Sequence, residues 1–291
     1  MKAPDFDYVK ARSVAEALEL LARHGDDARI LAGGQTLLAA LNLRLSEPKL
    51  LIDIGGLAEL RGIERRGERL HIGALTTHSE IEASPLVAEL APLLCAAAPH
   101  IGHRAIRNAG TWGGSLAHAD PASEWPCCLL ALDGVVTVRG RAGERRIPAA
   151  DFFRAILTTA LAPDELLVDA DVPIATSADW FGFDELARRR GDYGVAGLAV
   201  AARFQGATAQ QVRLAFLGMG ATPLRARRTE ALLAGQPLTG ASIELALAGL
   251  QADLDPFPDL HHSAAMKQHL AGVLARRLLS AALASRAALA A

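Results

Sequence analysis

The most unusual stretch of this sequence is Ala109-Gly-Thr-Trp-Gly-Gly-Ser-Leu-Ala-His-Ala-Asp-Pro-Ala-Ser-Glu124. Hydroxyl, imidazole and carboxylate side chains alternate there with small residues, a pattern that neither fills a core nor forms an ordinary solvated helix. Such a composition is typical of a binding loop. Its centre, Thr111-Trp112-Gly113-Gly114-Ser115, offers two hydroxyls and two unobstructed glycine amides, which is chemistry suited to an anion such as phosphate.

A second glycine pair lies nearer the N-terminus. The sequence predicts a strand over 28–32, a turn at Gly33-Gly34-Gln35-Thr36 and a helix over 37–41. Glycines at such a turn leave main-chain N–H groups open to a phosphate, and Gln35 and Thr36 add side-chain donors. An isolated glycine pair is more often only a tight turn. Because two such loops occur here, we expect them to close on one diphosphate from both sides.

Neither loop matches the common nucleotide-binding signatures. No lysine follows the glycines as in a P-loop, and the spacing G-x-G-x-x-G is missing. A Walker-type NTPase and a standard Rossmann domain are therefore disfavoured.

Length and composition exclude further classes. The 291 residues suffice for one large domain or two to three small ones. With 30 Lys and Arg against 32 Asp and Glu, the chain lacks the basic excess of a dedicated nucleic-acid binder. Its 3 cysteines cannot supply the four thiolates of an iron–sulfur cluster. No signal region or long apolar run is present, so we expect a cytoplasmic protein without a membrane span.

Hydrophobic periodicity predicts an α+β chain. A polar connection at 173–179 is the favoured boundary before the C-terminal part. Helices are predicted over 13–22, with Ser13 as cap, and over 85–98, 127–132, 228–233, 241–252 and 264–283. Short strands are predicted within 60–76, and a hairpin is predicted from strands over 135–138 and 145–148. The other predicted strands are 50–54, 166–172, 181–186, 195–204 and 212–219.

Both loops resemble those of the FAD-binding medium subunits of molybdenum hydroxylases, a group that includes carbon monoxide dehydrogenase medium chains and xanthine dehydrogenase flavin subunits. Ala32-Gly-Gly-Gln-Thr36 is similar to the family's A-G-G-x-S, and 107–121 is similar to its long second motif. The segment 189–193, a basic-Gly-Asp-aromatic element, and the surroundings of Thr222-Pro223 and Lys267 extend the resemblance over essentially the whole chain. The sequence departs at Thr36, usually Ser, at Trp112, usually a smaller aliphatic residue, and at Glu124, often Asp.

The resemblance implies an FAD-binding fold of the p-cresol methylhydroxylase-like type. Two α/β subdomains, 1–57 and 58–175, would be followed by a C-terminal α+β domain, 176–291, with a three-stranded antiparallel sheet and helices. FAD would lie between the two subdomains, with its diphosphate on loops 32–36 and 111–115 and its ring facing the C-terminal domain.

The resemblance also implies roles for single residues. Ile101 and Leu161 would pack on the flavin, Asp120 and Glu124 would lie near the ribose and adenine end, and Tyr193 would approach the isoalloxazine face. Arg188, in the run 188–190, is either a solvated strand end or a charge near the ring that stabilises its reduced form. The expected cofactor-binding residues are Ala32, Gly33, Gly34, Gln35, Thr36, Ile101, Thr111, Gly113, Gly114, Ser115, Asp120, Glu124, Leu161, Arg188 and Tyr193.

The function that the resemblance implies is electron transfer in an oxidoreductase complex. A small partner chain would carry two [2Fe-2S] clusters and a large one the molybdenum-pterin cofactor, in a dimer of heterotrimers. Electrons would pass from molybdenum through the clusters to FAD on this chain and then to an external acceptor. No catalytic acid–base pair is expected here. The alternatives are a self-sufficient FAD-dependent oxidase or dehydrogenase and a non-catalytic scaffold that has lost FAD.

Other polar residues support no competing site. His100, His103 and His118 lack the spacing of a zinc signature, so we expect no metal on this chain. Cys127 and Cys128 fall in an apolar run and are expected to behave as small hydrophobic residues. Trp112 has two open roles, packing under its loop or altering access to the flavin.

Overall fold

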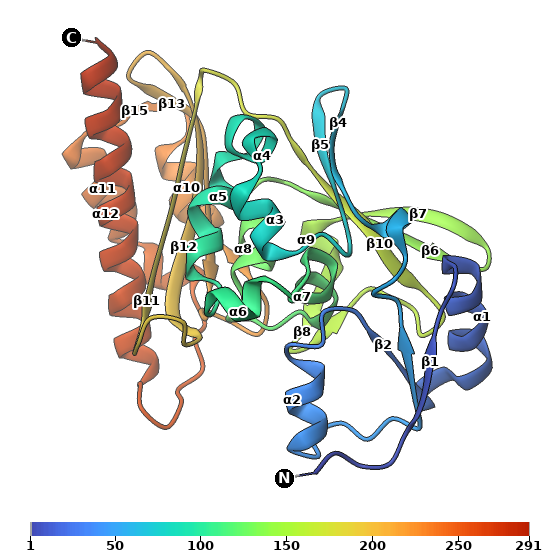
Figure 1. The fold of residues 1–291 in the computed structure, drawn as a ribbon. Coiled ribbons are helices and arrows are strands. Elements are labelled where there is room, and N and C mark those ends of the chain that lie inside the picture. The colour runs from blue at the N-terminus through green and yellow to red at the C-terminus, as the bar shows by residue number, and fades with distance from the viewer. Residues whose placement is uncertain (1, 291) are drawn as a thin grey trace.

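The computed structural model describes residues 2–290, and three larger β-sheets follow one another along it (Figure 1). In the first sheet, β1 (Asp7–Lys10) and β2 (Ala28–Leu31) flank β3 (Leu50–Asp53), and both run parallel to it. Helix α1 (Val14–His24) buries Val14, Ala17, Leu18 and Leu21 at helical spacing, and the Ser13 side chain accepts from the Glu16 N–H. The predicted first helix and its cap are confirmed. Helix α2 (Leu37–Asn42) follows the first glycine loop.

The second sheet is antiparallel throughout. Its order is β4-β5-β10-β6-β7, which keeps the predicted hairpin between its two last strands. The strand bounds are Ile63–Arg66 for β4, Arg69–Gly73 for β5, Leu166–Pro173 for β10, Val135–Gly140 for β6 and Gly143–Pro148 for β7.

Short helices cover one face of this sheet and separate it from the third sheet (Figure 1). They are α3 (His78–Ala83), α4 (Pro85–Leu90), α5 (Pro92–Ala97), α6 (Arg104–Arg107), α7 (Trp112–His118), α8 (Glu124–Ala131) and α9 (Ala149–Phe152), followed by the small hairpin of β8 (Phe153–Ala155) and β9 (Thr158–Thr159). The helical stretch predicted over 85–98 is present, but it is divided into α4 and α5 at Ala91. The chain leaves helical geometry at Ala91 because Pro92 disfavours the helical conformation of the residue before it.

The third sheet contains the predicted antiparallel strands, β11 (Asp179–Ala187), β12 (Gly194–Gln205) and β13 (Thr208–Leu217). Two short strands, β14 (Leu224–Arg225) and β15 (Gln236–Pro237), add to β13. Helices α10 (Arg227–Leu233), α11 (Gly240–Leu247) and α12 (Ala264–Ala290) cover its outer face. The helix predicted over 241–252 is shorter than expected, since α11 ends before Gly249 and only a 3₁₀ turn follows.

The division of the chain at 57/58 and 175/176 stays our proposal. Each larger sheet lies within one of the three proposed ranges. The core of the first range nevertheless continues into the second, where Leu75, Leu166 and Val168 pack against it. No helix within residues 2–290 is long and apolar enough to cross a bilayer.

Candidate cofactor site

The two glycine loops touch each other. Gly33 lies so close to the second loop that a Cβ on it would overlap the Ala109 carbonyl oxygen and come within 2.9 Å of the Gly110 Cα. On the other side, a Cβ on Gly114 would lie 3.8 Å from the Ala32 Cβ. The predicted convergence of the loops is therefore present in the structure. The reason for glycine at position 33 is close contact between the loops, and not, as predicted, removal of a side chain from the phosphate.

The first loop offers a row of unpaired main-chain donors. In the part of the chain that the structure describes, no protein acceptor takes the N–H of Gly33, Gly34, Gln35 or Thr36. The turn is held instead by its carbonyls, since the Gly33 oxygen accepts from Gln35 Nε2 at 3.1 Å and the Gly34 oxygen accepts from the Leu38 N–H. Successive unpaired main-chain N–H groups in a turn before a helix can form an anion-binding concavity. The residues present therefore fit a diphosphate.

The second loop differs from the prediction, because its amides are already used. The Gly113 N–H donates to the Ala74 oxygen at 2.8 Å, and the Gly114 N–H donates to Thr111 Oγ1 at 3.2 Å. A Cβ on Gly113 would crowd Ala74, so this glycine lets α7 pack on the end of β5. The hydroxyls of Thr111 and Ser115 remain as the groups that could reach a ligand.

Buried aromatic rings pack beneath the second loop. Trp112 is fully buried, and its ring meets that of Trp125 edge-on, with centroids 5.3 Å apart. Trp125 Nε1 donates to His78 Nδ1 at 2.9 Å, and a Cβ on Gly110 would lie 2.6 Å from His78 Nε2. Of the two roles left open for Trp112, the structure supports packing under the loop.

The position of His78 gives a prediction about stability. Burial, followed by the charge of Arg107, lowers the pKa of His78 from 6.5 to about 4. An unfolded chain therefore binds a proton there more readily than the native protein, and the free energy of unfolding should lose about 3 kcal/mol from this group as pH falls from 6.5 to about 4. His78→Gln keeps an acceptor for Trp125 but does not titrate. Urea unfolding curves across this range should diverge between wild type and variant, and parallel curves would contradict the prediction.

A cleft opens beside the loops, between the 120–122 segment and the C-terminal domain. Its volume is about 440 Å³, and Asp120, Arg188 and Tyr193 line it. Tyr193 is 62 % exposed along the cleft. Partial burial and the charge of Asp120 raise the pKa of Tyr193, while the nearby Thr36 side chain opposes the shift. The first loop and the cleft are therefore adjacent at Thr36 and Tyr193.

Asp120 and Tyr193 both line this cleft, whereas the resemblance implies that they contact different parts of the cofactor. Their contacts with FAD stay a prediction. Glu124 is buried at the start of α8, Ile101 is buried in the helical layer, and Leu161 packs partly buried against the same core. None of these three side chains lines the cleft in the described part of the chain.

Sequence reasoning missed the far wall of the cleft. That wall is the segment before α12, with Phe257, Asp259 and Leu260, and the start of α12, where Lys267 Nζ pairs with Asp259 at 2.9 Å. Only the resemblance around Lys267 pointed to this region. The Asp255 N–H donates to the Met219 oxygen and so ties the segment before α12 to the residues after β13. The Gly218 N–H, also after β13, donates to the Pro121 oxygen on the opposite wall.

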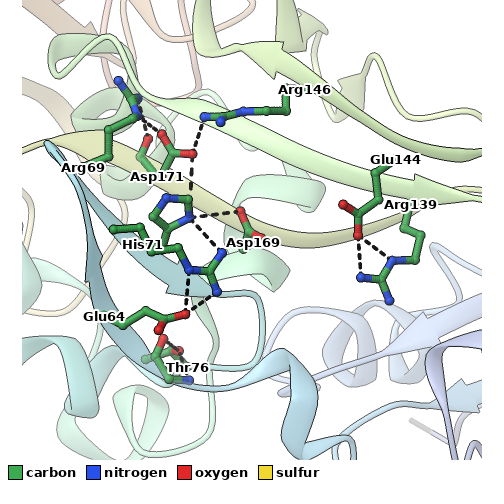
Figure 2. A network of polar contacts seen from close by, with 11 residues as sticks. Glu64, Arg69, His71, Thr76, Arg139, Glu144, Arg146, Asp169 and Asp171 are labelled. Atoms are coloured by element: carbon green, nitrogen blue, oxygen red, sulfur yellow. Dashed lines mark hydrogen bonds and ion pairs between the residues drawn. The ribbon is translucent and has the colours of Figure 1, made fainter.

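A second polar cluster lies on the outer face of the second sheet (Figure 2). His71 Nδ1 is 4.0 Å from an Asp169 oxygen and 3.8 Å from an Asp171 oxygen, so the three residues could offer metal ligands. The Asp171 carboxylate, however, already accepts from Arg69 on one oxygen and from Arg146 on the other. Two guanidinium groups on one ligand disfavour a cation, and we interpret the cluster as an ion-pair network of the sheet.

Comparisons with known proteins agree with this geometry. A family model described as the FAD binding domain in molybdopterin dehydrogenase matches residues 4–175, and one described as the CO dehydrogenase flavoprotein C-terminal domain matches residues 181–282. The chain belongs to the FAD-binding medium subunits of the molybdenum hydroxylases. It is thus an oxidoreductase subunit with a p-cresol methylhydroxylase-like FAD-binding fold, as the sequence predicted.

Relatives of this medium-subunit family match along almost the full chain. The alpha subunit of the 6-hydroxypseudooxynicotine dehydrogenase complex of Paenarthrobacter nicotinovorans is 40% identical over 97% of this chain and 96% of its own. The carbon monoxide dehydrogenase medium chain of Hydrogenophaga pseudoflava is 36% identical over 97% and 98%. A solved structure of carbon monoxide dehydrogenase from the same organism superposes with a TM-score of 0.95 at 37% identity, covering 98% of this chain and 99% of that chain.

Proposed function

We propose that this chain carries FAD and passes electrons within a heteromeric molybdenum hydroxylase. The observation that carries the proposal is the first loop, which has unpaired N–H groups at residues 33–36 and touches the second loop at Gly33. Bound FAD would supply the capacity to accept and release electrons singly or in pairs. The substrate of the complex and the final electron acceptor are left open.

We assign these main-chain and side-chain groups the following roles in binding FAD. The N–H groups of 33–36 hold the diphosphate, and the hydroxyls of Thr111 and Ser115 flank it. Tyr193, which lies near Thr36, and Arg188 face the ring end of the cofactor from the C-terminal domain. We place Asp120 at this same end and keep Ile101 and Leu161 as proposed contacts elsewhere on FAD. The buried Glu124 carboxyl is proposed to lie near the cofactor without touching it.

The iron–sulfur clusters and the molybdenum-pterin cofactor would belong to partner chains. Several relatives carry names of medium subunits or chains of larger complexes. On this chain Cys127 and Cys128 are buried, and Cys95 is directed at the Ile81 oxygen, so the cysteines are not arranged as cluster ligands. We propose a small [2Fe-2S] subunit and a large molybdenum subunit as partners, in a dimer of heterotrimers in the cytoplasm.

Reconstitution tests the proposal. The purified chain, incubated with FAD and desalted, should show flavin absorption near one FAD per chain and quenched tryptophan fluorescence, since Trp112 lies under the loop. Co-expression with its partner chains should yield a complex that contains iron and molybdenum. A chain that stays colourless would contradict the proposal and favour the scaffold. Turnover of an organic substrate by the isolated FAD-loaded chain would favour a self-sufficient enzyme.

A further inference from the structure

Two carboxyl groups, the buried Glu124 and the half-buried Glu185, lie where α8 packs against the third sheet. Glu124 is the first residue of α8 and is 9 % exposed. Glu185 lies on β11, two residues after Phe183, so it shares the face of the sheet that packs on the helical layer. Glu185 Oε2 is buried and finds no hydrogen-bond partner within residues 2–288. The two groups are close enough for the charge of Glu124 to act on Glu185.

These carboxyls differ from the other buried acids, because no cation neutralises them. Asp171 is paired with Arg69 and Arg146, and Glu230 is paired with Arg225 at 2.6 Å. Among residues 2–288, neither Glu124 nor Glu185 forms a salt bridge. The charge of Asp120 acts on Glu124 and that of Asp184 acts on Glu185, and the Asp184 carboxylate is itself paired with Arg277. A buried carboxylate without a counter-ion is costly, and such a group holds its proton instead.

The other titratable groups near the pair do not supply a positive charge. Burial raises the pKa of both neighbouring thiols on α8, so they stay neutral. Burial lowers the pKa of His100, whose ring meets the Phe183 ring of β11 edge-on. Cys95 of α5 is directed at the Ile81 oxygen. Burial raises the pKa of Glu124 to about 7 and that of Glu185 to about 8, with each further raised by a neighbouring carboxylate.

The pair lies directly behind the wall of the cofactor cleft. Gly194 lines the cleft, and a Cβ on it would lie 2.9 Å from the Glu185 carboxyl carbon. The charge of Glu124 also acts on Tyr193, which lines the same cleft. A change of charge in the cleft would therefore act on both carboxyls through protein rather than through water, where the interaction would be screened.

We propose that Glu124 and Glu185 form a redox-linked proton site. When electrons arrive on the cofactor in the cleft, from reduced iron–sulfur clusters or from an electrode, the pair binds a proton from solvent. When the electrons leave, the pair returns the proton. The two residues are positioning residues that balance charge, and the inference rests on the proposed function.

The pH dependence of the FAD midpoint potential tests this inference. Spectroelectrochemistry on the FAD-loaded full chain counts the protons taken up per two electrons. Between about pH 6.5 and 8.5, where the pair is partly ionised, wild type should take up a fraction of a proton more than Glu124→Gln or Glu185→Gln. Below about pH 5 the three proteins should agree, because the pair is protonated in both redox states. Glu244→Gln, which changes an exposed carboxylate paired with Arg276, should match wild type throughout.

Infrared difference spectroscopy keeps the inference testable if a glutamine variant fails to fold. The reduced-minus-oxidised spectrum of wild type should contain a change in the carbonyl stretch of a protonated carboxyl group. Absence of that band, or equal proton counts in wild type and both folded, FAD-loaded variants, would overturn the inference and leave the proposed function intact. Loss of FAD from both variants would overturn it as well, because the carboxyls would then be binding groups. A wild-type chain that takes up no FAD would overturn the proposed function and this inference together.

Discussion

Replacing Gly33 by alanine should abolish stable FAD retention. The added Cβ would overlap the Ala109 carbonyl oxygen, and both the overlapped atom and its neighbours are backbone, which cannot rotate away. The first loop must therefore move off the second, and its row of N–H groups moves with it. Overpacking of this kind costs about 1–3 kcal/mol, and at the upper limit FAD affinity falls about 100-fold. Fluorescence titration with FAD measures the change.

Gly272→Ala is the matched control. A Cβ at Gly272 meets nothing within 4 Å, and the residue lies in the interior of α12. The same substitution there should leave FAD affinity unchanged and stabilise the helix by up to about 1 kcal/mol. Far-ultraviolet circular dichroism should show that both variants are folded. Wild-type FAD affinity in Gly33→Ala would contradict the assignment of this loop to the diphosphate.

The convergence of the loops could be predicted from sequence, but which of the two loops keeps free main-chain N–H groups could not. Glycine pairs after a strand and before a helix indicate an anion site wherever they occur. Whether an N–H is free depends on partners far away in the chain. Gly113 loses its N–H to Ala74, and Thr111 forms a bridge with Thr77 that ties the second loop to the end of the second sheet. No local pattern around residues 111–115 reveals those partners.

The sequence also does not reveal which polar side chains lose contact with water in the folded protein. His78 and Glu185 are ordinary polar residues in their local segments. Nothing in the spacing around them indicates that His78 becomes buried or that Glu185 becomes half-buried. The surroundings of both residues are set by tertiary contacts. Trp125 donates a hydrogen bond to His78, and Glu124 at the start of α8 lies near Glu185. By contrast, Asp120 and Tyr193 belong to motifs that the family resemblance covers, and the structure brings both into one cleft.

The ion-pair network of the second sheet should be more sensitive to loss of its cations than to loss of its anion. The Asp171 side chain is completely buried, whereas the Arg69 and Arg146 side chains are 28% and 52% exposed. The double variant Arg69→Met, Arg146→Met leaves the buried Asp171 carboxylate beside His71 and a second carboxylate, that of Asp169. Removing the partners of a buried charge costs about 3–5 kcal/mol, and we expect that loss in the free energy of unfolding at pH 7.

Asp171→Asn should cost less, because the two guanidinium groups that it releases can turn to water. Urea unfolding measures both variants. The network lies on the face of the sheet opposite the helical layer, since His71 alternates with the core residues Leu70 and Ile72. Each folded variant should therefore bind FAD as wild type does.

A larger loss of unfolding free energy in Asp171→Asn than in the double arginine variant would contradict the ion-pair interpretation. Stabilisation of wild type by added Zn²⁺, absent in Asp171→Asn, would instead favour a metal site at His71, Asp169 and Asp171.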